Sequence, residues 1–361
     1  FANFHGLRDY YSLVKYIART LAQLQTQEPT DVLKMKVITR GLQRNFGGLP
    51  TELSTLQELF IANLHSSENY KVSVIELIDE NIHDKMARHL MLITSGDVVV
   101  DILEQQLDKL GRDRITIYGS HFEEDLTDDY NYRILNKIII CMEQGLVLIL
   151  KDLDSIYGSL YDMLNQNYMV VGEKKNCRVA LGPYSNPMCQ VHDDFRCIVL
   201  VDESKINIVD PPFLNRFEKQ NLKFVDILSQ NEHAVIIHLK NWVQQLTDVP
   251  TKQYEVVDVF PVYGADMIPS LVHKCFLERE ENRTCMTDSE FVDELISFCK
   301  ETLLWIMKPE SVIRLRSSKF GTNSKTSKQV QHITSEYLHL PIHEGLQKYL
   351  QSEINKVCEG S

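Results

Sequence analysis

An arginine in the middle of the chain stands among residues suited to presenting it to a phosphate group. Arg216 follows Pro211 and Pro212, which fix φ and exclude a regular helix, so we expect a stiff backbone there. A guanidinium stays charged and grips phosphate oxygens through parallel hydrogen bonds. The segment therefore predicts an arginine delivered to phosphate. The alternative is an ion pair between Arg216 and a nearby carboxylate, Glu218 or Asp210.

Two carboxylates follow a strongly apolar run of residues. The run 146–150 reads LVLIL, which is typical of a parallel strand buried on both faces. Asp152 and Asp154 come after it, and alternation would place both side chains on one side if the strand continued. Carboxylates at this position hold Mg²⁺ and activate water in nucleotide hydrolysis. Hydrolysis commonly uses an adjacent Asp-Glu pair, and the absence of a Glu beside Asp152 argues against it.

A short glycine turn joins a predicted strand at 90–93 to a predicted helix at 98–110. This is the P-loop arrangement, in which glycines admit phosphate, a lysine reaches its oxygens and a hydroxyl holds Mg²⁺. The turn here offers Ser95 and Gly96 as cofactor contacts, but it has no lysine and carries Asp97, whose carboxylate would repel phosphate. The sequence predicts weak nucleotide binding at most and no hydrolysis at this site.

A second arginine, Arg8, lies in the first turn of a helix expected to begin after Gly6. Apolar residues recur there at helical spacing and predict a buried stripe: Leu7, Tyr10, Tyr11, Val14 and Ile17. Arg8 stands one step off that stripe. Its alternative role is a surface ion pair with Asp9 or another neighbour.

Strands and helices alternate through the middle of the chain, which implies a parallel sheet between two helical layers. Other expected elements there are a helix at 72–89, a strand at 114–118, helices at 130–144 and 155–166, a hairpin at 169–182, a loop at 183–194 and a strand at 197–201. Helices at 31–43 and at 51–64, the latter capped by Thr51, precede them. Helices at 234–246, 289–307 and 342–357 follow, with a mobile loop at 317–329.

The composition narrows the function classes. The net charge of −12 disfavours nucleic acid as a partner, and no apolar run reaches the length of a membrane span. The eight cysteines are scattered without zinc-binding spacing, so we predict no metal site. We expect His332, His339 and His343 to be surface or packing residues. The chain begins at Phe1 without an initiator Met, and we expect a segment of a longer protein.

These motifs, in this order, resemble AAA+ ATPases. The stretches that carry the resemblance are GLRDYYSLVK (6–15), HLMLITSGD (89–97), LVLILKDLDSIYGSLYDMLNQ (146–166) and DPPFLNRFEKQ (210–220). They are similar to the AAA+ core of the mysterin family of giant RING-finger E3 ubiquitin ligases. The resemblance implies an α/β, P-loop-type large domain of three layers with a parallel sheet, at 71–225. It would be flanked by helical lid domains, 1–70 from the preceding AAA+ unit and 226–361.

The resemblance also implies roles for single residues. Arg8 matches the sensor-2 arginine of a lid, and Arg216 matches the arginine finger at the end of a large domain. Both would act on the ATP and Mg²⁺ of the preceding unit, while this unit would not hydrolyse ATP. The remaining alternatives are a purely architectural module that closes a ring and part of a dynein-like motor ring.

For the whole protein, the resemblance implies ubiquitin transfer and ATP hydrolysis. Its partners would be neighbouring AAA+ units of the same chain, together with ubiquitin and a ubiquitin-conjugating enzyme bound by other regions. Zinc would be bound only outside this segment, because no RING pattern occurs in it. The implied location is the cytoplasm, with lipid-droplet association.

Overall fold

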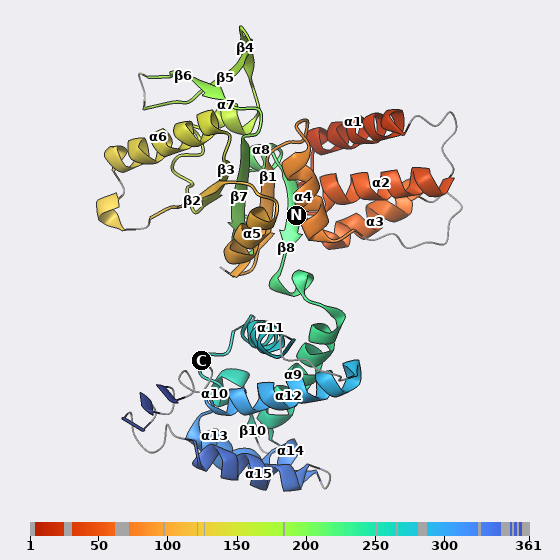
Figure 1. Cartoon of the computed structure of the whole chain (residues 1–361), viewed down its shortest axis with the longest axis vertical. Helices are drawn as coiled ribbons and strands as arrows, with labels where there is room; N and C mark the ends of the chain where they lie inside the picture. The colour runs from red at the N-terminus through yellow and green to blue at the C-terminus, as the bar shows by residue number, and fades with distance from the viewer. Residues whose placement is uncertain are drawn as a thin grey trace. The chain divides into compact units, whose positions relative to one another are not determined.

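The computed structural model of the chain (Figure 1) describes most of its residues. The described residues are 4–24, 31–61, 72–96, 98–120, 122–125, 127–182, 185–249, 252–264, 266–280, 287–323, 326–340, 347–348, 350–351 and 354–355. They form two compact units, Phe1–Asp226 and Ile227–Ser361, which we describe separately. The three predicted domains stay a prediction, and the predicted boundary at residue 70 lies outside the described residues.

The first unit is built on a five-stranded parallel sheet with the strand order β2-β3-β7-β1-β8. Its strands are β1 (Leu90–Thr94), β2 (Arg114–Tyr118), β3 (Val147–Lys151), β7 (Arg196–Asp202) and β8 (Glu218–Leu222). β1 and β3 belong to one sheet, as predicted, with β7 between them. Thr94 pairs with Asp202, and Lys151 pairs with Leu200, so the carboxyl ends of these three strands meet at one edge.

Helices cover both faces of this sheet. They are α4 (Val74–His83) and α5 (Val98–Lys109) on one face, and α6 (Asp128–Gln144) and α7 (Tyr161–Leu164) on the other. Because side chains alternate along a strand, Leu90 and Leu92 join the core under α4 and α5, while Met91 and Ile93 join the core under α6 and α7. The predicted α/β fold of three layers with a parallel sheet is confirmed.

Two predictions for the segment between β3 and β7 are wrong. Instead of a helix at 155–166, i→i+3 turns such as Ser159 N to Ile156 O (3.0 Å) lead into the single-turn α7, because Gly158 weakens a regular helix. The expected loop at 183–194 contains a strand too short to give a clear pattern. That strand, β6 (Met188–Val191), joins β4 (Met169–Val171) and β5 (Lys174–Arg178) in an antiparallel sheet. The predicted hairpin around Gly172 is confirmed.

Three helices precede the sheet: α1 (Leu7–Gln23), α2 (Asp31–Phe46) and α3 (Pro50–Ile61). α3 begins with Pro50 in its first turn, so Thr51 is not its cap. The expected buried stripe of α1 is also wrong, since Leu7 is 73% and Tyr11 58% exposed while Asp9 and Leu13 are buried. Helical periodicity identifies an apolar face, but the neighbouring elements decide which face is covered.

The second unit is mainly helical. It contains α9 (Gln230–Thr247), α10 (Val256–Val259), α11 (Met267–Glu280), α12 (Asp288–Leu304), α13 (Pro309–Arg314), α14 (Lys319–Thr322), α15 (Ser327–Leu338) and the short strands β9 (Asp248–Val249) and β10 (Lys252–Gln253). α9 and α12 confirm the helices predicted at 234–246 and 289–307. The mobile loop expected at 317–329 is wrong, because Ser318 accepts a hydrogen bond from Gly321 N and starts α14.

Some sequence predictions for the second unit concern residues that are not described. Most of the helix expected at 342–357 lies outside the described residues, as do His343, Cys285 and Cys358. In the described part of the chain, no helix is both long enough and apolar enough to span a bilayer.

Candidate functional site

A cavity of about 460 Å³ opens at the carboxyl edge of the five-stranded sheet, beside the ends of β3 and β7. Its charged lining residues are Asp152, Asp154, Asp202, Lys205, Asp210 and Arg216. Tyr157 and Phe213 form its aromatic wall, with their ring centroids 4.8 Å apart. Three of the residues predicted from the sequence, Asp152, Asp154 and Arg216, therefore share one cavity.

Asp152 has an unusual backbone conformation at the point where β3 ends. Its φ of 54° lies in the left-handed region, which costs a residue with a side chain roughly 1 kcal/mol or more. The loop after β2 lies directly against it, because Gly119 N donates to Lys151 O at 2.8 Å. A Cβ on Gly119 would stand 1.6 Å from the Asp152 carbonyl oxygen. Gly119 therefore packs directly against the strained backbone of Asp152, where a larger residue would not fit.

This turn changes the expected relation between the two carboxylates. The strand ends at Lys151, so strand alternation does not place Asp152 and Asp154 on one side. Asp152 instead accepts a hydrogen bond from Lys205 Nζ at 2.7 Å, and this bond raises the pKa of Lys205. Asp154 is exposed, while Leu153 between them is buried in the core. A cation binding at the Oδ1 of Asp152 would have to displace the Lys205 ammonium.

The predicted nucleotide turn follows β1 at the same edge of the sheet. Ser95 is partly exposed, and Gly96 has a φ of 91°, which a glycine adopts without strain. α5 begins two residues later, so the predicted strand–turn–helix arrangement is present, while Asp97 lies outside the described residues. Ser95 and Gly96 do not line the cavity that contains Asp152.

Arg216 lies in the turn between α8 (Pro211–Leu214) and β8. Its guanidinium carbon stands 4.5 Å from the ring centroid of Tyr161 and 5.7 Å from that of Phe213. Within the described ranges, Arg216 forms no ion pair with a carboxylate, and the alternative partner Glu218 is buried against Arg44. Burial lowers the pKa of Arg216, and a second positive charge, that of Arg8, lowers it further.

Arg8 contacts the residue that follows α7, the short helix that carries Tyr161. It is exposed, and its Nη1 donates to Asn165 Oδ1 at 2.5 Å, just after the end of α7. Its expected alternative partner, Asp9, points into the protein and binds other cations. Arg8 and Arg216 are thus near each other, with one guanidinium bonded to the end of α7 and the other stacked on Tyr161.

A buried cluster beneath these arginines fixes the backbone that carries them. Lys219 Nζ donates to both oxygens of Asp9, at 3.0 and 3.2 Å, and to Leu214 O at 3.2 Å. Arg88 donates to Asp9 at 2.8 Å and to Asn215 O at 3.3 Å. Asp9 adjoins Arg8, and Asn215 adjoins Arg216. The cluster therefore joins the two segments that carry the arginines.

Burial and charge oppose each other in this cluster. Burial alone would raise the pKa of Asp9, but the nearby His5, Lys219 and Arg88 hold it well below its usual value. Burial lowers the pKa of Lys219 to about 8, although Asp9 works to raise it. Both side chains are fully buried, so their charges depend on each other rather than on water.

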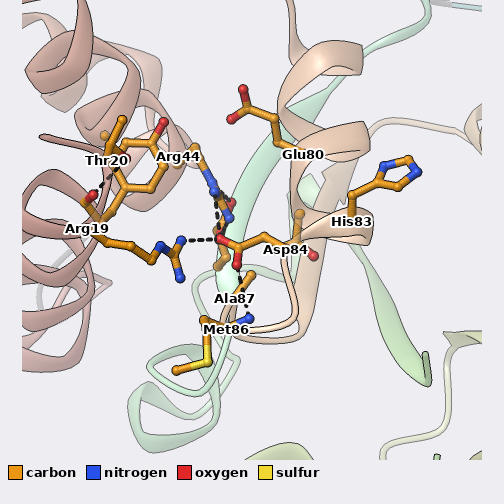
Figure 2. A network of polar contacts seen from close by, with 12 residues as sticks. Arg19, Thr20, Arg44, Glu80, His83, Asp84, Met86 and Ala87 are labelled. Carbon is orange, nitrogen blue, oxygen red and sulfur yellow. Dashed lines mark hydrogen bonds and ion pairs between the residues drawn. The ribbon is translucent and has the colours of Figure 1, made fainter. Parts of the chain in front are cut away.

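A second group of ion pairs continues the contact between the N-terminal helices and the sheet. Arg44 of α2 donates through Nε and Nη2 to the two carboxylate oxygens of Glu218 on β8, each at 3.0 Å. Figure 2 shows Arg19 and Arg44 converging on Asp84, which lies after α4. Gln220 donates to the backbone oxygens of Gln43 and Arg44. α1 and α2 are thus bonded to the edge strand β8.

No motif in the sequence predicts these buried charges. Their one local signal is the spacing of Gly6 and Asp9, in which Asp9 caps the start of α1 by accepting from Gly6 N at 2.9 Å. The strand EKQNL (218–222) has no apolar alternation, and its burial became evident only from the fold. Among the residues that the structure describes, no group of three or more His, Cys, Asp and Glu side chains could hold a metal ion.

Residues 79–228 match the sequence model of the RNF213 AAA domain. The chain is 32% identical to E3 ubiquitin-protein ligase RNF213 of Mus musculus over 373 residues, which cover 97% of the chain and 7% of that protein. It is 30% identical to E3 ubiquitin-protein ligase RNF213 of Homo sapiens, over 98% of the chain and 7% of that protein. It is 25% identical to E3 ubiquitin-protein ligase rnf213-beta of Danio rerio, over 98% of the chain and 9% of that protein. The chain therefore spans less than a tenth of the length of these relatives.

Proposed function

This chain belongs with the AAA core of RNF213, and from that relationship we propose that it completes the ATP site of a preceding AAA unit without hydrolysing ATP at its own. In this proposal, Arg8 and Arg216 both contact the γ-phosphate held by that unit. The resemblance to the mysterin family, predicted from the sequence, is confirmed by these relatives.

The observation that carries the proposal is the placement of two arginines near each other, neither of which forms an ion pair with a carboxylate within the described residues, although the more distant Asp210 acts on Arg216. Like charges at short range repel, so a fold that holds two guanidiniums together favours an anion there. Asp9 and Glu218, the carboxylates nearest in sequence, are bonded to other cations in the buried clusters. The stacking of Arg216 on Tyr161 also orients a flat guanidinium before any ligand binds.

The carboxyl edge of the five-stranded sheet supports the other part of the proposal, that this unit does not hydrolyse ATP itself. Asp152, the candidate Mg²⁺ ligand, is bonded to Lys205, and the turn at Ser95 and Gly96 brings no lysine to a phosphate. Phosphoryl transfer depends on cations that neutralise the developing charge on the phosphate. Without them, binding at Ser95, Gly96, Asp152 and Asp154 would be weak and hydrolysis absent.

Several parts of this proposal concern the whole protein. ATP and Mg²⁺ would sit mainly at the preceding unit, and zinc, ubiquitin and a ubiquitin-conjugating enzyme would bind other regions. The two mammalian relatives are named E3 ubiquitin-protein ligases, and ubiquitin transfer by the protein that contains this chain is part of the proposal. Cytoplasmic location and lipid-droplet association also stay predictions.

A second candidate function is an architectural module. The buried bonds of Asp9, Lys219, Arg44 and Glu218 fasten the N-terminal helices to the sheet without help from a nucleotide. A module of this kind would hold neighbouring units together whether or not ATP is bound. Turnover measurements separate the two candidates.

The test is steady-state ATP hydrolysis by the full-length protein. Arg216→Ala should lower turnover at least tenfold, since finger arginines contribute roughly 10³–10⁵ in well-studied cases. Arg8→Ala should also lower it, and Arg216→Lys should restore it only in part, because an ammonium lacks the planar fork. Arg133→Ala is the matched control, since Arg133 also lies over a tyrosine ring, 5.9 Å from that of Tyr130.

Asp152→Asn tests the unit's own site in the same assay and should leave turnover unchanged. Loss of turnover with Asp152→Asn would mean that this unit hydrolyses ATP. Unchanged turnover with Arg216→Ala, in a protein whose thermal unfolding matches the wild type, would leave the architectural module as the function.

A further inference from the structure

The small antiparallel sheet ends in an apolar strand that is open on one side. β4 is the edge strand in the order β4-β5-β6, and in Figure 1 its hairpin tip points away from the five-stranded sheet. Met169, Val170 and Val171 are 47%, 68% and 65% exposed. Three consecutive exposed apolar residues on an edge strand are uncommon, because such an edge readily pairs with another strand.

The backbone of β4 has hydrogen-bonding groups available on this open side. The two-residue turn at Gly172, with φ of 66°, closes the hairpin at the pair Val171 and Lys174. Closing pairs exchange backbone hydrogen bonds, so the next pair, Val170 and Lys175, directs its N–H and C=O groups outward. In the described part of the chain, no backbone bond outside the hairpin uses Val170.

Cations lie on the same face as two of the exposed apolar side chains. Strand alternation and the pairing register place Met169, Val171, Lys174, Arg178 and Met188 on one face of the small sheet. Within the described ranges, neither Lys174 nor Arg178 forms an ion pair, and Lys174 donates to the neutral Gln190 at 3.0 Å. On the other face, Lys175 is already paired with Asp193 at 2.6 Å. In a chain of net charge −12, this face is a local basic site.

We propose that β4 binds an extended segment of a partner protein in which apolar residues alternate with carboxylates. The segment would add to the small sheet as a fourth strand and bond to the outward N–H and C=O of Val170. Its apolar side chains would cover Val170 on one face. On the other face its carboxylates would attract the long side chains of Arg178 and of Lys174, and Lys174 would exchange its bond to Gln190 of β6 for a carboxylate. The proposal is independent of the ATP-site function.

The test measures binding of fluorescently labelled eight-residue peptides to the chain by anisotropy. The probes are an alternating Val/Glu peptide and an alternating Val/Lys peptide of the same length. The Val/Glu peptide should bind at least tenfold more tightly, and the difference should shrink as salt is added. In hydrogen exchange, the Val170 amide should become protected when that peptide binds. Equal affinities for the two peptides, or no binding of either, would overturn the proposal.

Two variants separate backbone pairing from charge. Val170→Pro removes an outward N–H without breaking the bonds to β5, so the hairpin should remain while Val/Glu binding falls at least tenfold. Lys174→Glu with Arg178→Glu should weaken that binding tenfold or more, while Lys137→Glu, a charge reversal at an exposed position of α6, should have little effect. Unchanged binding with Val170→Pro would rule out strand addition. Concentration-dependent dimerisation that Val170→Pro abolishes would mean that β4 pairs with a second copy instead.

Discussion

Two clusters of charge in the first unit differ in how far water reaches them. The cluster of Asp9, Lys219, Arg44 and Glu218 is almost completely buried, with side-chain exposures of 0–4%. At the carboxyl edge of the sheet, Asp152 and Lys205 form an ion pair of similar length, but their side chains are 30% and 45% exposed. The buried cluster bonds α1 and α2 to β8, whereas the exposed one lines a cavity.

The comparison teaches that ion-pair distance alone does not distinguish a structural contact from a site. A buried pair whose every atom has a partner cannot exchange that partner without a large penalty, so it serves the fold. A half-exposed pair is worth little to stability and can be exchanged for a ligand. Arg8 and Arg216, to which we assign contacts with ATP, are themselves open to a ligand, but the backbone that carries them is held by the buried cluster.

The largest expected effect is on folding stability. Arg44→Ala leaves the Glu218 carboxylate buried without its bidentate partner and should lower the free energy of unfolding by about 3–5 kcal/mol. Chemical denaturation of the chain measures this. Replacing both residues, as Arg44→Met with Glu218→Leu, should cost less than Arg44→Ala alone. A loss below about 1 kcal/mol for Arg44→Ala would show that water reaches this cluster and would remove the contrast.

A steric change at the carboxyl edge should come next. Gly119→Ala puts a methyl group 1.6 Å from the Asp152 carbonyl oxygen, so the strained turn must move, at a cost of about 2–3 kcal/mol. Gly158→Ala makes the same chemical change where nothing lies within 4 Å and should be neutral or slightly stabilising. Thermal and urea unfolding of both variants test this. Equal stability of the two would mean that backbone packing does not hold the Asp152 turn.

The pH dependence of stability should identify Lys219. Its pKa is about 8 in the folded protein against an ordinary 10.5, so between these values the unfolded chain binds more protons than the folded one. Raising the pH through this window therefore favours folding. The free energy of unfolding of the wild type, relative to Lys219→Met, should rise by about 2 kcal/mol from pH 7 to 9.5. A flat or falling difference would indicate that Asp9 offsets burial and the charge of Arg88 and keeps the pKa of the ammonium at or above its ordinary value.

The smallest effect should come from the exposed ion pair. Lys205→Ala removes the partner of Asp152, but solvent screens both groups, so the loss of stability should stay below about 1 kcal/mol. A double-mutant cycle with Asp152→Ala gives the coupling between the two side chains. A coupling free energy as large as that between Arg44 and Glu218 would mean that this pair also stabilises the fold.

Much of the sheet could be predicted from the sequence because its strands are uniformly apolar. The run at 146–150 and the strand at 197–201 can be buried only between two helical layers, and both strands lie there. β8 could not be recognised, because Glu218, Lys219 and Gln220 become buried only through partners about 170–210 residues away. The prediction that the apolar stripe of α1 is buried is wrong for the same reason, because the face of α1 that packs is the one that carries Asp9.

The residues of the candidate site could be predicted from the sequence, but the contacts between their side chains could not. The sequence brought attention to Arg8, Arg216 and Asp152, since each stands at the end of a recognisable element. It could not indicate that Lys205 would bind Asp152, because Asp152 leaves the strand conformation with a φ of 54° and its partner is 53 residues away. The nearness of Arg8 to Arg216 likewise depends on a long-range contact, the hydrogen bond from Arg8 to Asn165.

The contact between α2 and β8 also has a consequence for a chain that is still being made. Arg44 and Glu218 are 174 residues apart, and a ribosome needs roughly 10–35 s to add that many residues. During this delay the first two helices are present without the strand that receives them. The surface that they expose there carries ionised side chains, which water solvates well and which give another nascent chain little to adhere to. The ionised contact surface thus keeps α1 and α2 solvated until β8 has been synthesised.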